Sequence, residues 1–135
     1  MEVFPEWMPP NKFALVDIWP AIEKAKENVN QMMNLVLQTI LDEPEIEGLF
    51  SMVFCAKRSM DMDTIDKRIE ISNKSPKPVF YWLIGEHEEV IRISQILAQH
   101  NIPSFINLED MVKIFSLLVQ ESKNKAKLLN YLNSS

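Results

Sequence analysis

The residues best suited to bind an anion are Lys57, Arg58 and Ser59, which lie between an apolar run and a predicted helix. Two cations and a hydroxyl at this position could hold a phosphate group, because the first amides of a helix are free donors and its dipole favours negative charge there. The same helix start carries Asp61 and Asp63, whose carboxylates interact with the dipole themselves. The three residues are therefore our phosphate-loop candidates, although the two aspartates favour a solvated loop.

A second loop of the same kind begins at Gly85, directly after another apolar run. Gly85 joins the phosphate-loop candidates because glycine lets a backbone approach a ligand closely. The loop continues with Glu86, Glu88 and Glu89, which crowd the start of the next predicted helix. Capping of that helix by its own acidic residues is the interpretation we favour.

Several other kinds of chemistry are excluded by counts and spacing. The chain has one cysteine and two separated histidines, which gives no zinc-ligand spacing. It has only two glycines, Gly48 and Gly85, and neither of the common nucleotide-binding glycine motifs. Cys55 ends an apolar run and is expected to be an inert core residue. We predict no catalytic residue, no metal ligand and no cofactor bound by this chain alone.

Two short apolar runs, Leu49–Cys55 and Val79–Ile84, position these loops. Each run leads straight into a helix-like stretch, and strands that are apolar on both faces are expected where helices cover both sides of a parallel sheet. A third short strand is expected at 103–106. The pattern predicts a small three-layer α/β domain, doubly wound around a mostly parallel sheet, with any ligand site beyond the carboxyl ends of the strands.

The rest of the chain divides into an arm, a body and a tail. Residues 1–16 hold three prolines and are expected to form an extended arm. The body spans 17–120, with helices expected at about 20–42, 63–73, 88–99 and from 108. Residues 121–135 are lysine-rich, with apolar residues at helical spacing, and are expected to form a peripheral helix.

The amino-acid composition limits the classes of partner and the cellular compartment that we expect. The chain has 135 residues, of which 47% are hydrophobic, and a formal net charge of −5. This charge argues against nucleic acid or an anionic membrane as the main partner. No apolar run approaches the length of a membrane span, and a single cysteine fits a reducing cytoplasm.

Three segments of the chain together resemble one family, the NDP-forming (ADP-forming) acyl-CoA synthetases, which are related to succinyl-CoA ligase. They are Phe4–Pro10 followed by Val16–Ala21, then Lys77–Gly85, then His100–Phe105 followed by Glu109–Val112. The order and spacing of the segments, and no single motif, carry this resemblance. It covers nearly the whole chain.

The resemblance implies the second of the two flavodoxin-like ligase subdomains of such an enzyme. In that family a phosphohistidine on another subdomain relays phosphate between nucleotide and acyl substrate, and coenzyme A takes the acyl group. The full enzyme uses CoA, ADP or ATP, and magnesium. The implied partners are the CoA-binding, histidine-bearing and ATP-grasp domains, in the same chain or another. The interface candidates are Trp7, Asp17 and Trp19. The alternatives are that Asp17 is only a helix-start carboxylate and that the aromatic side chains are buried against the long helix.

The sequence departs from the family pattern at three positions. Ala14 and Leu15 stand in place of Asn-Pro, Glu86 replaces the second glycine of a pair, and Asn101 replaces a glycine. The chain also shows no segment like the family's histidine loop, so we do not expect it to complete the reaction alone. The alternative is a non-catalytic regulatory or binding module that kept the fold and lost the site.

Overall fold

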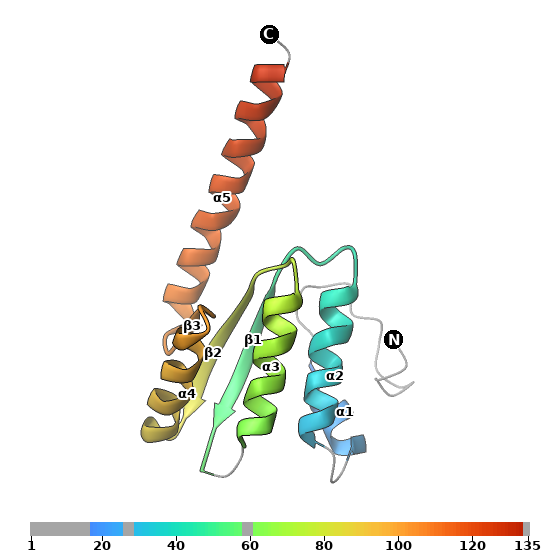
Figure 1. Cartoon of the computed structure of the whole chain (residues 1–135), viewed down its shortest axis with the longest axis vertical. Helices are drawn as coiled ribbons and strands as arrows, with labels where there is room; N and C mark the ends of the chain where they lie inside the picture. The colour runs from blue at the N-terminus through green and yellow to red at the C-terminus, as the bar shows by residue number, and fades with distance from the viewer. Residues whose placement is uncertain (1–16, 26–28, 58–60, 134–135) are drawn as a thin grey trace.

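The computed structural model describes residues 17–25, 29–57 and 61–133, so the predicted arm at 1–16 lies outside the described residues. The described elements are α1 (Trp19–Ala25), α2 (Val29–Asp42), β1 (Leu49–Cys55), α3 (Met62–Lys74), β2 (Val79–Gly85), α4 (His87–Gln99), β3 (Ser104–Phe105) and α5 (Leu108–Asn133). The three strands form a parallel sheet in the order β1-β2-β3 (Figure 1). The predicted α/β fold with helices around a parallel sheet is confirmed.

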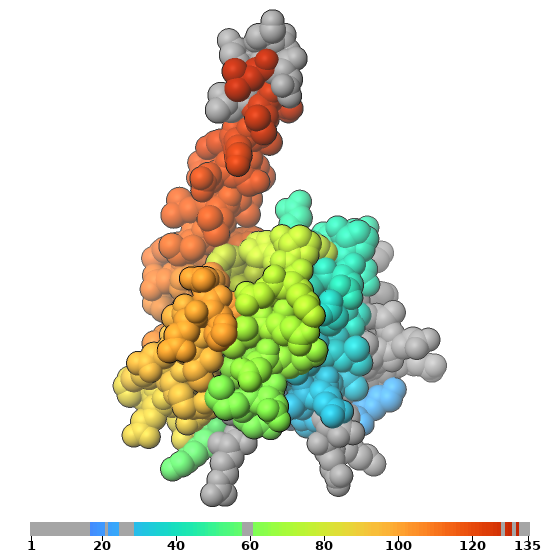
Figure 2. All heavy atoms as spheres, viewed as in Figure 1, coloured from blue at the N-terminus to red at the C-terminus, as the bar shows by residue number. Residues whose placement is uncertain are grey.

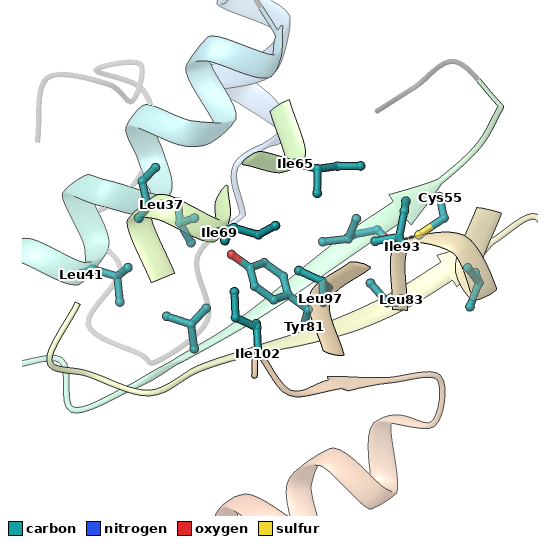
Figure 3. Close-up of a cluster of buried hydrophobic side chains, with 14 residues drawn as sticks. Leu37, Leu41, Cys55, Ile65, Ile69, Tyr81, Leu83, Ile93, Leu97 and Ile102 are labelled. Atoms are coloured by element: carbon teal, nitrogen blue, oxygen red, sulfur yellow. Dashed lines mark hydrogen bonds between the residues drawn. The ribbon is translucent and has the colours of Figure 1, made fainter. Parts of the chain in front are cut away.

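One face of the sheet forms the main hydrophobic core with α2, α3 and α4 (Figure 3). Side chains alternate along a strand, so every second residue of β1 and β2 points to this face. The core residues are Leu37, Leu41, Val53, Cys55, Ile65, Ile69, Ile71, Val79, Tyr81, Leu83, Val90, Ile93, Leu97 and Ile102. Burying about 14 apolar side chains supplies the main driving force for this fold.

The opposite face of the sheet carries a cluster of aromatic rings. The ring of Phe115 in α5 lies 4.7 Å from that of Phe50 and 5.9 Å from that of Phe80, both in edge-to-face geometry. Phe105 of β3 extends the cluster, with its ring 6.0 Å from Phe80. Because α5 covers this second face, the molecule has helices on both sides of the sheet, as the apolar strands predict.

Three polar residues mark the predicted helix ends. Asp61 accepts a hydrogen bond from the amide of Thr64 and caps α3, while Asn107 accepts one from the amide of Glu109 at the start of α5. Asn101, after α4, has a φ of 58°, the left-handed conformation that asparagine tolerates best among residues with a side chain. These contacts fix where each helix begins or ends.

Two helical segments differ from the sequence prediction. α5 is one helix of 26 residues, with no boundary between the body and the predicted separate helix at 121–135. No glycine or proline occurs between residues 108 and 133 to interrupt it. The predicted helix at 20–42 is described as α1 and α2, with residues 26–28 outside the described residues, and it ends at Asp42 as expected.

Candidate functional site

The carboxyl ends of β1 and β2 meet at one edge of the sheet, as parallel strands require. Cys55 and Gly85 are register partners at the ends of these strands. The structure therefore brings two phosphate-loop candidates, Lys57 and Gly85, to the same edge. The other two, Arg58 and Ser59, lie outside the described residues.

Gly85 is fixed by backbone geometry. Its φ is +129°, which residues with a side chain rarely adopt, and an added Cβ would lie 2.1 Å from the carbonyl oxygen of Cys55. Directly after it, the amide of Glu86 donates a 2.8 Å hydrogen bond to that same oxygen. The glycine is thus required for the two strand ends to pass each other, whether or not a ligand is present.

The side chain of Glu86 reaches back to the first loop. Its Oε1 accepts a hydrogen bond of 3.3 Å from the backbone amide of Lys57. Both residues are exposed, so water competes for this contact. A bound phosphate would need such amides as donors, and here a carboxylate of the protein already engages one of them.

Both helices that start at this edge, α3 and α4, carry acidic residues at their N-termini, where a ligand anion would otherwise bind. Asp61 caps α3 at 2.8 Å from the amide of Thr64, and hydrogen bonds from the hydroxyl and amide of Thr64 lower the pKa of its carboxyl group. The first turn of α4 holds Glu88 and Glu89. Carboxylates at a helix N-terminus satisfy the dipole that would otherwise attract a ligand anion.

Arg92 of α4 links the two helices at this edge. Its Nη2 donates a 2.8 Å hydrogen bond to Glu89, forming an ion pair, and its Nη1 lies 3.8 Å from the sulfur of Met62 in α3. The guanidinium therefore neutralises one acidic group of α4 and packs against α3. It serves the contact between the helices.

Cys55 is an inert core residue, as predicted. It is fully buried, and its Sγ lies 3.6 Å from the carbonyl oxygen of Val53. Burial, assisted by the charge of Glu89, raises the pKa of the thiol, which disfavours the reactive thiolate. Within 17–25, 29–57 and 61–133 no three acidic, histidine or cysteine side chains gather as metal ligands.

A buried charge on α3 escaped the sequence analysis. Arg68 is only 6% exposed, and its Nη1 has no hydrogen-bond partner. It borders a cavity of about 10 Å³ that is otherwise lined by Val53, Ile65, Tyr81, Ile93 and Leu97. Burial lowers the pKa of the guanidinium. The cavity has room for about one water molecule and none for an organic ligand.

The burial of Arg68 could have been predicted from its spacing, three residues after Ile65 and next to Ile69 on the apolar face of the helix.

Two of the three predicted interface residues begin α1, and the third, Trp7, lies outside the described residues. Asp17 accepts a 2.9 Å hydrogen bond from the amide of Trp19 and so acts as a helix-start carboxylate. The Trp19 side chain is 61% exposed, and its indole nitrogen donates to Glu23 at 2.8 Å. Asp17 and Trp19 lie together at one helix start, with the indole on the surface.

Comparisons with protein-family models, curated proteins and solved structures find no match to this chain. Of the helices in the described ranges, none combines the length and the apolar character that crossing a membrane demands.

Proposed function

We propose that this chain is a ligase-type subdomain of an NDP-forming acyl-CoA synthetase, which supports catalysis by a phosphohistidine on another subdomain. The observation that carries the proposal is the sheet edge where Cys55 and Gly85 pair and where α3 and α4 both begin. A partner domain docked across this edge would face the starts of α3 and α4, where Asp61, Glu88 and Glu89 already lie against the helix dipoles. The three segments that resemble the family lead to the same proposal.

In this proposal the chain contributes shape and electrostatics, and the other domains contribute the chemistry. CoA, the nucleotide and magnesium would be held by the CoA-binding, histidine-bearing and ATP-grasp domains. Lys57, and Arg58 next to it in the sequence, would supply positive charge to a phosphoryl group presented from across the edge. The compartment that fits the proposal is the cytoplasm, where Cys55 stays reduced.

Reconstitution tests this proposal. The other three domains of an ADP-forming synthetase would be purified and supplied with acyl-CoA, ADP and phosphate, with and without this chain. We expect ATP and free CoA to form only when the chain is added, and the chain alone to form none. Equal turnover in its absence, or turnover by the chain alone, would refute the proposal.

The contact between Glu86 and the amide of Lys57 favours a second candidate, a binding module that has lost its phosphate contact. The two candidates differ in their response to inorganic phosphate. In a subdomain that contacts phosphate, added phosphate shifts the amide NMR signals of Lys57 and Gly85. In a module that has lost the site, these signals stay in place while Glu86→Gln restores the shift.

A further inference from the structure

The second half of α5 extends past the body of the protein (Figures 1 and 2). From Gln120 onward, every residue of α5 whose side chain is described is exposed. A single helix without tertiary contacts is marginally stable in water, because most helix stability in proteins comes from packing an apolar face. A projecting helix of this length therefore suggests a surface that packs on something else.

The apolar stripe that holds α5 on the sheet continues into this projecting half. Met111 is 1% exposed and Phe115 packs on the aromatic cluster. At helical spacing along the same side follow Val119, Ala126 and Leu129, and Leu129 is 51% exposed. An open hollow of about 350 Å³ lies along this stripe, lined by Phe115, Ser116, Val119, Gln120 and Lys123. The apolar stripe of α5 is therefore exposed beyond the point where the helix stops contacting the body of its own chain.

The sheet has a matching open surface on the side of the aromatic cluster. Phe50 and Met52 of β1 point to this side and are 39% and 55% exposed. α5 contacts chiefly β2 and β3 and reaches β1 through the ring of Phe115 on Phe50, which leaves Met52 and part of Phe50 exposed on the outer face of β1 among the described residues. An apolar surface of this kind on a strand at the sheet edge indicates a contact with another molecule.

Charge identifies the partner as a second copy of the chain. The projecting half of α5 carries Lys123, Lys125 and Lys127 against one acid, Glu121. Asp42 ends α2, and the loop that leads from it into β1 carries Glu43, Glu45 and Glu47. All four are exposed and outside the ion pairs found among the described residues, and the one lysine beside them, Lys77, donates to the backbone carbonyls of Leu41 and Glu43. Figure 1 shows that this loop and the projecting helix lie at the same end of the sheet but apart. Each chain thus presents a basic apolar helix and an acidic loop beside an apolar strand.

We infer that two copies of this chain form a reciprocal dimer, in which the projecting half of α5 from each lies on the outer face of β1 of the other. In this arrangement Leu129 and Leu132 pack against Phe50 and Met52, and the lysines of α5 face the acidic loop. Reciprocal packing of one surface on itself is the usual form of a two-fold dimer. Direct pairing of two α5 helices would instead bring lysine against lysine, which like-charge repulsion disfavours.

Charge exchange tests this inference on the full chain. The first variant carries Lys123→Glu, Lys125→Glu and Lys127→Glu, and the second carries Glu43→Lys, Glu45→Lys and Glu47→Lys. Sedimentation velocity should give twice the 15.7 kDa chain mass for the wild type and a markedly weaker dimer for each variant alone. An equimolar mixture of the two variants should restore the dimer.

Apolar variants provide the matched control. Leu129→Ser with Leu132→Ser should give a monomer, whereas Ile91→Ser, at an exposed apolar position on α4, should leave the dimer unchanged. Circular dichroism checks that each variant keeps its helices. A wild type that stays at 15.7 kDa up to about 0.1 mM would overturn the inference. So would a dimer that the acidic-loop variant leaves intact, since that result would indicate pairing of α5 with α5.

Discussion

Gly85 shows how a residue with an apparent ligand role can be required by the backbone alone. We predicted Gly85 to be part of a phosphate loop because it is a glycine at the end of a predicted strand. It lies at the same edge of the sheet as Lys57, as expected for the ends of parallel strands. Its positive φ and its closeness to the carbonyl of Cys55 follow from the register of two strands that are 30 residues apart in sequence. No local pattern contains that register, so the steric role could not be predicted.

Replacing Gly85 by alanine should destabilise the protein strongly. The new Cβ would collide with the Cys55 carbonyl in a conformation that alanine disfavours, so we expect a loss of roughly 2–4 kcal/mol in the free energy of unfolding. Urea denaturation measures this loss. Gly48→Ala is the control and should cost less, because Gly48 has no positive φ and its added Cβ would lie 3.0 Å from the Pro78 ring and 3.2 Å from the Pro78 carbonyl oxygen, contacts that small shifts relieve. Similar losses for both variants would contradict this account.

Arg68 is the opposite case, a charged residue that the fold places in the core. Its spacing on α3 was visible, but charged residues are seldom buried, so a pattern of apolar residues leaves them out. Its Nη1 has no partner and the cavity beside it has room for about one water molecule, so its burial costs desolvation that few contacts offset.

We expect Arg68→Met to stabilise the protein. Methionine keeps the length and most of the volume of the side chain, and removes a buried charge whose Nη1 lacks a hydrogen bond. Replacing buried ionic groups by well-packed apolar side chains is often neutral or stabilises by about 1–4 kcal/mol, and a charge without an ion-pair partner should fall on the stabilising side. The midpoint of urea unfolding should therefore rise. Arg68→Ala also removes the packing of the aliphatic stem, so its urea midpoint should be lower than that of Arg68→Met. A urea midpoint of Arg68→Met below that of the wild type would show that the buried charge is compensated.

At the scale of whole elements, the strands were predicted more accurately than the helix boundaries. β1 matches the predicted run from Leu49 to Cys55, and β2 extends the second run by Gly85 alone, because turn-forming residues bound both apolar runs. The continuity of α5 was missed because its polar middle at 120–127 looked like a separate tail. A helix continues through polar residues when no breaker stops it.

The solvent face of α3 carries an ion-pair network that makes stability depend on pH. Glu70 accepts hydrogen bonds from Lys67 at 2.7 Å and from Lys74 at 2.6 Å, which lower the pKa of its carboxyl group to about 2. A lowered pKa in the folded state means that the network stabilises the protein above the ordinary glutamate pKa. This contribution is lost as the pH falls from about 4.5 toward 2.

Glu70→Gln should therefore lower the urea midpoint slightly at pH 7 and leave it unchanged near pH 2. The effect is small because the network is solvated, and added salt should reduce it further. The comparison is a set of urea titrations of wild type and variant between pH 7 and pH 2. The control is Asp66→Asn on the same helix, which lies outside the ion pairs of the described residues. A difference between wild type and Glu70→Gln that is constant across this pH range would rule out the ion pairs as its cause.

For the whole molecule, the separation of charge along the chain is the main feature beyond the fold. Residues 121–135 carry one acidic and three basic residues, a net charge of +2, while the rest of the chain accounts for −7 of the total of −5. Composition gives only the total, from which we predicted that nucleic acid and anionic membranes are not the main partners. The separation of charge becomes informative once the structure shows that the lysine-rich half of α5 projects from the rest of the molecule (Figure 1).

The dimer inferred from this charge pattern should weaken with salt without disappearing. Raising the ionic strength from about 0.01 M to about 1 M shortens the Debye length from about 30 Å to about 3 Å, which screens lysines from the acidic loop. The reciprocal dimer holds six such exposed pairs, three on each side, which contribute together on the order of 2–4 kcal/mol, so the dissociation constant should rise by about 30-fold or more. The apolar contact of Leu129 and Leu132 with β1 does not depend on screening and should hold the remaining dimer together. Sedimentation equilibrium at the two salt concentrations measures both parts. In the triple Lys→Glu variant the salt dependence should reverse, because salt then screens repulsion between like charges, while the double leucine variant should lose the association. A wild-type dissociation constant that salt leaves unchanged would show that the lysines do not face the acidic loop.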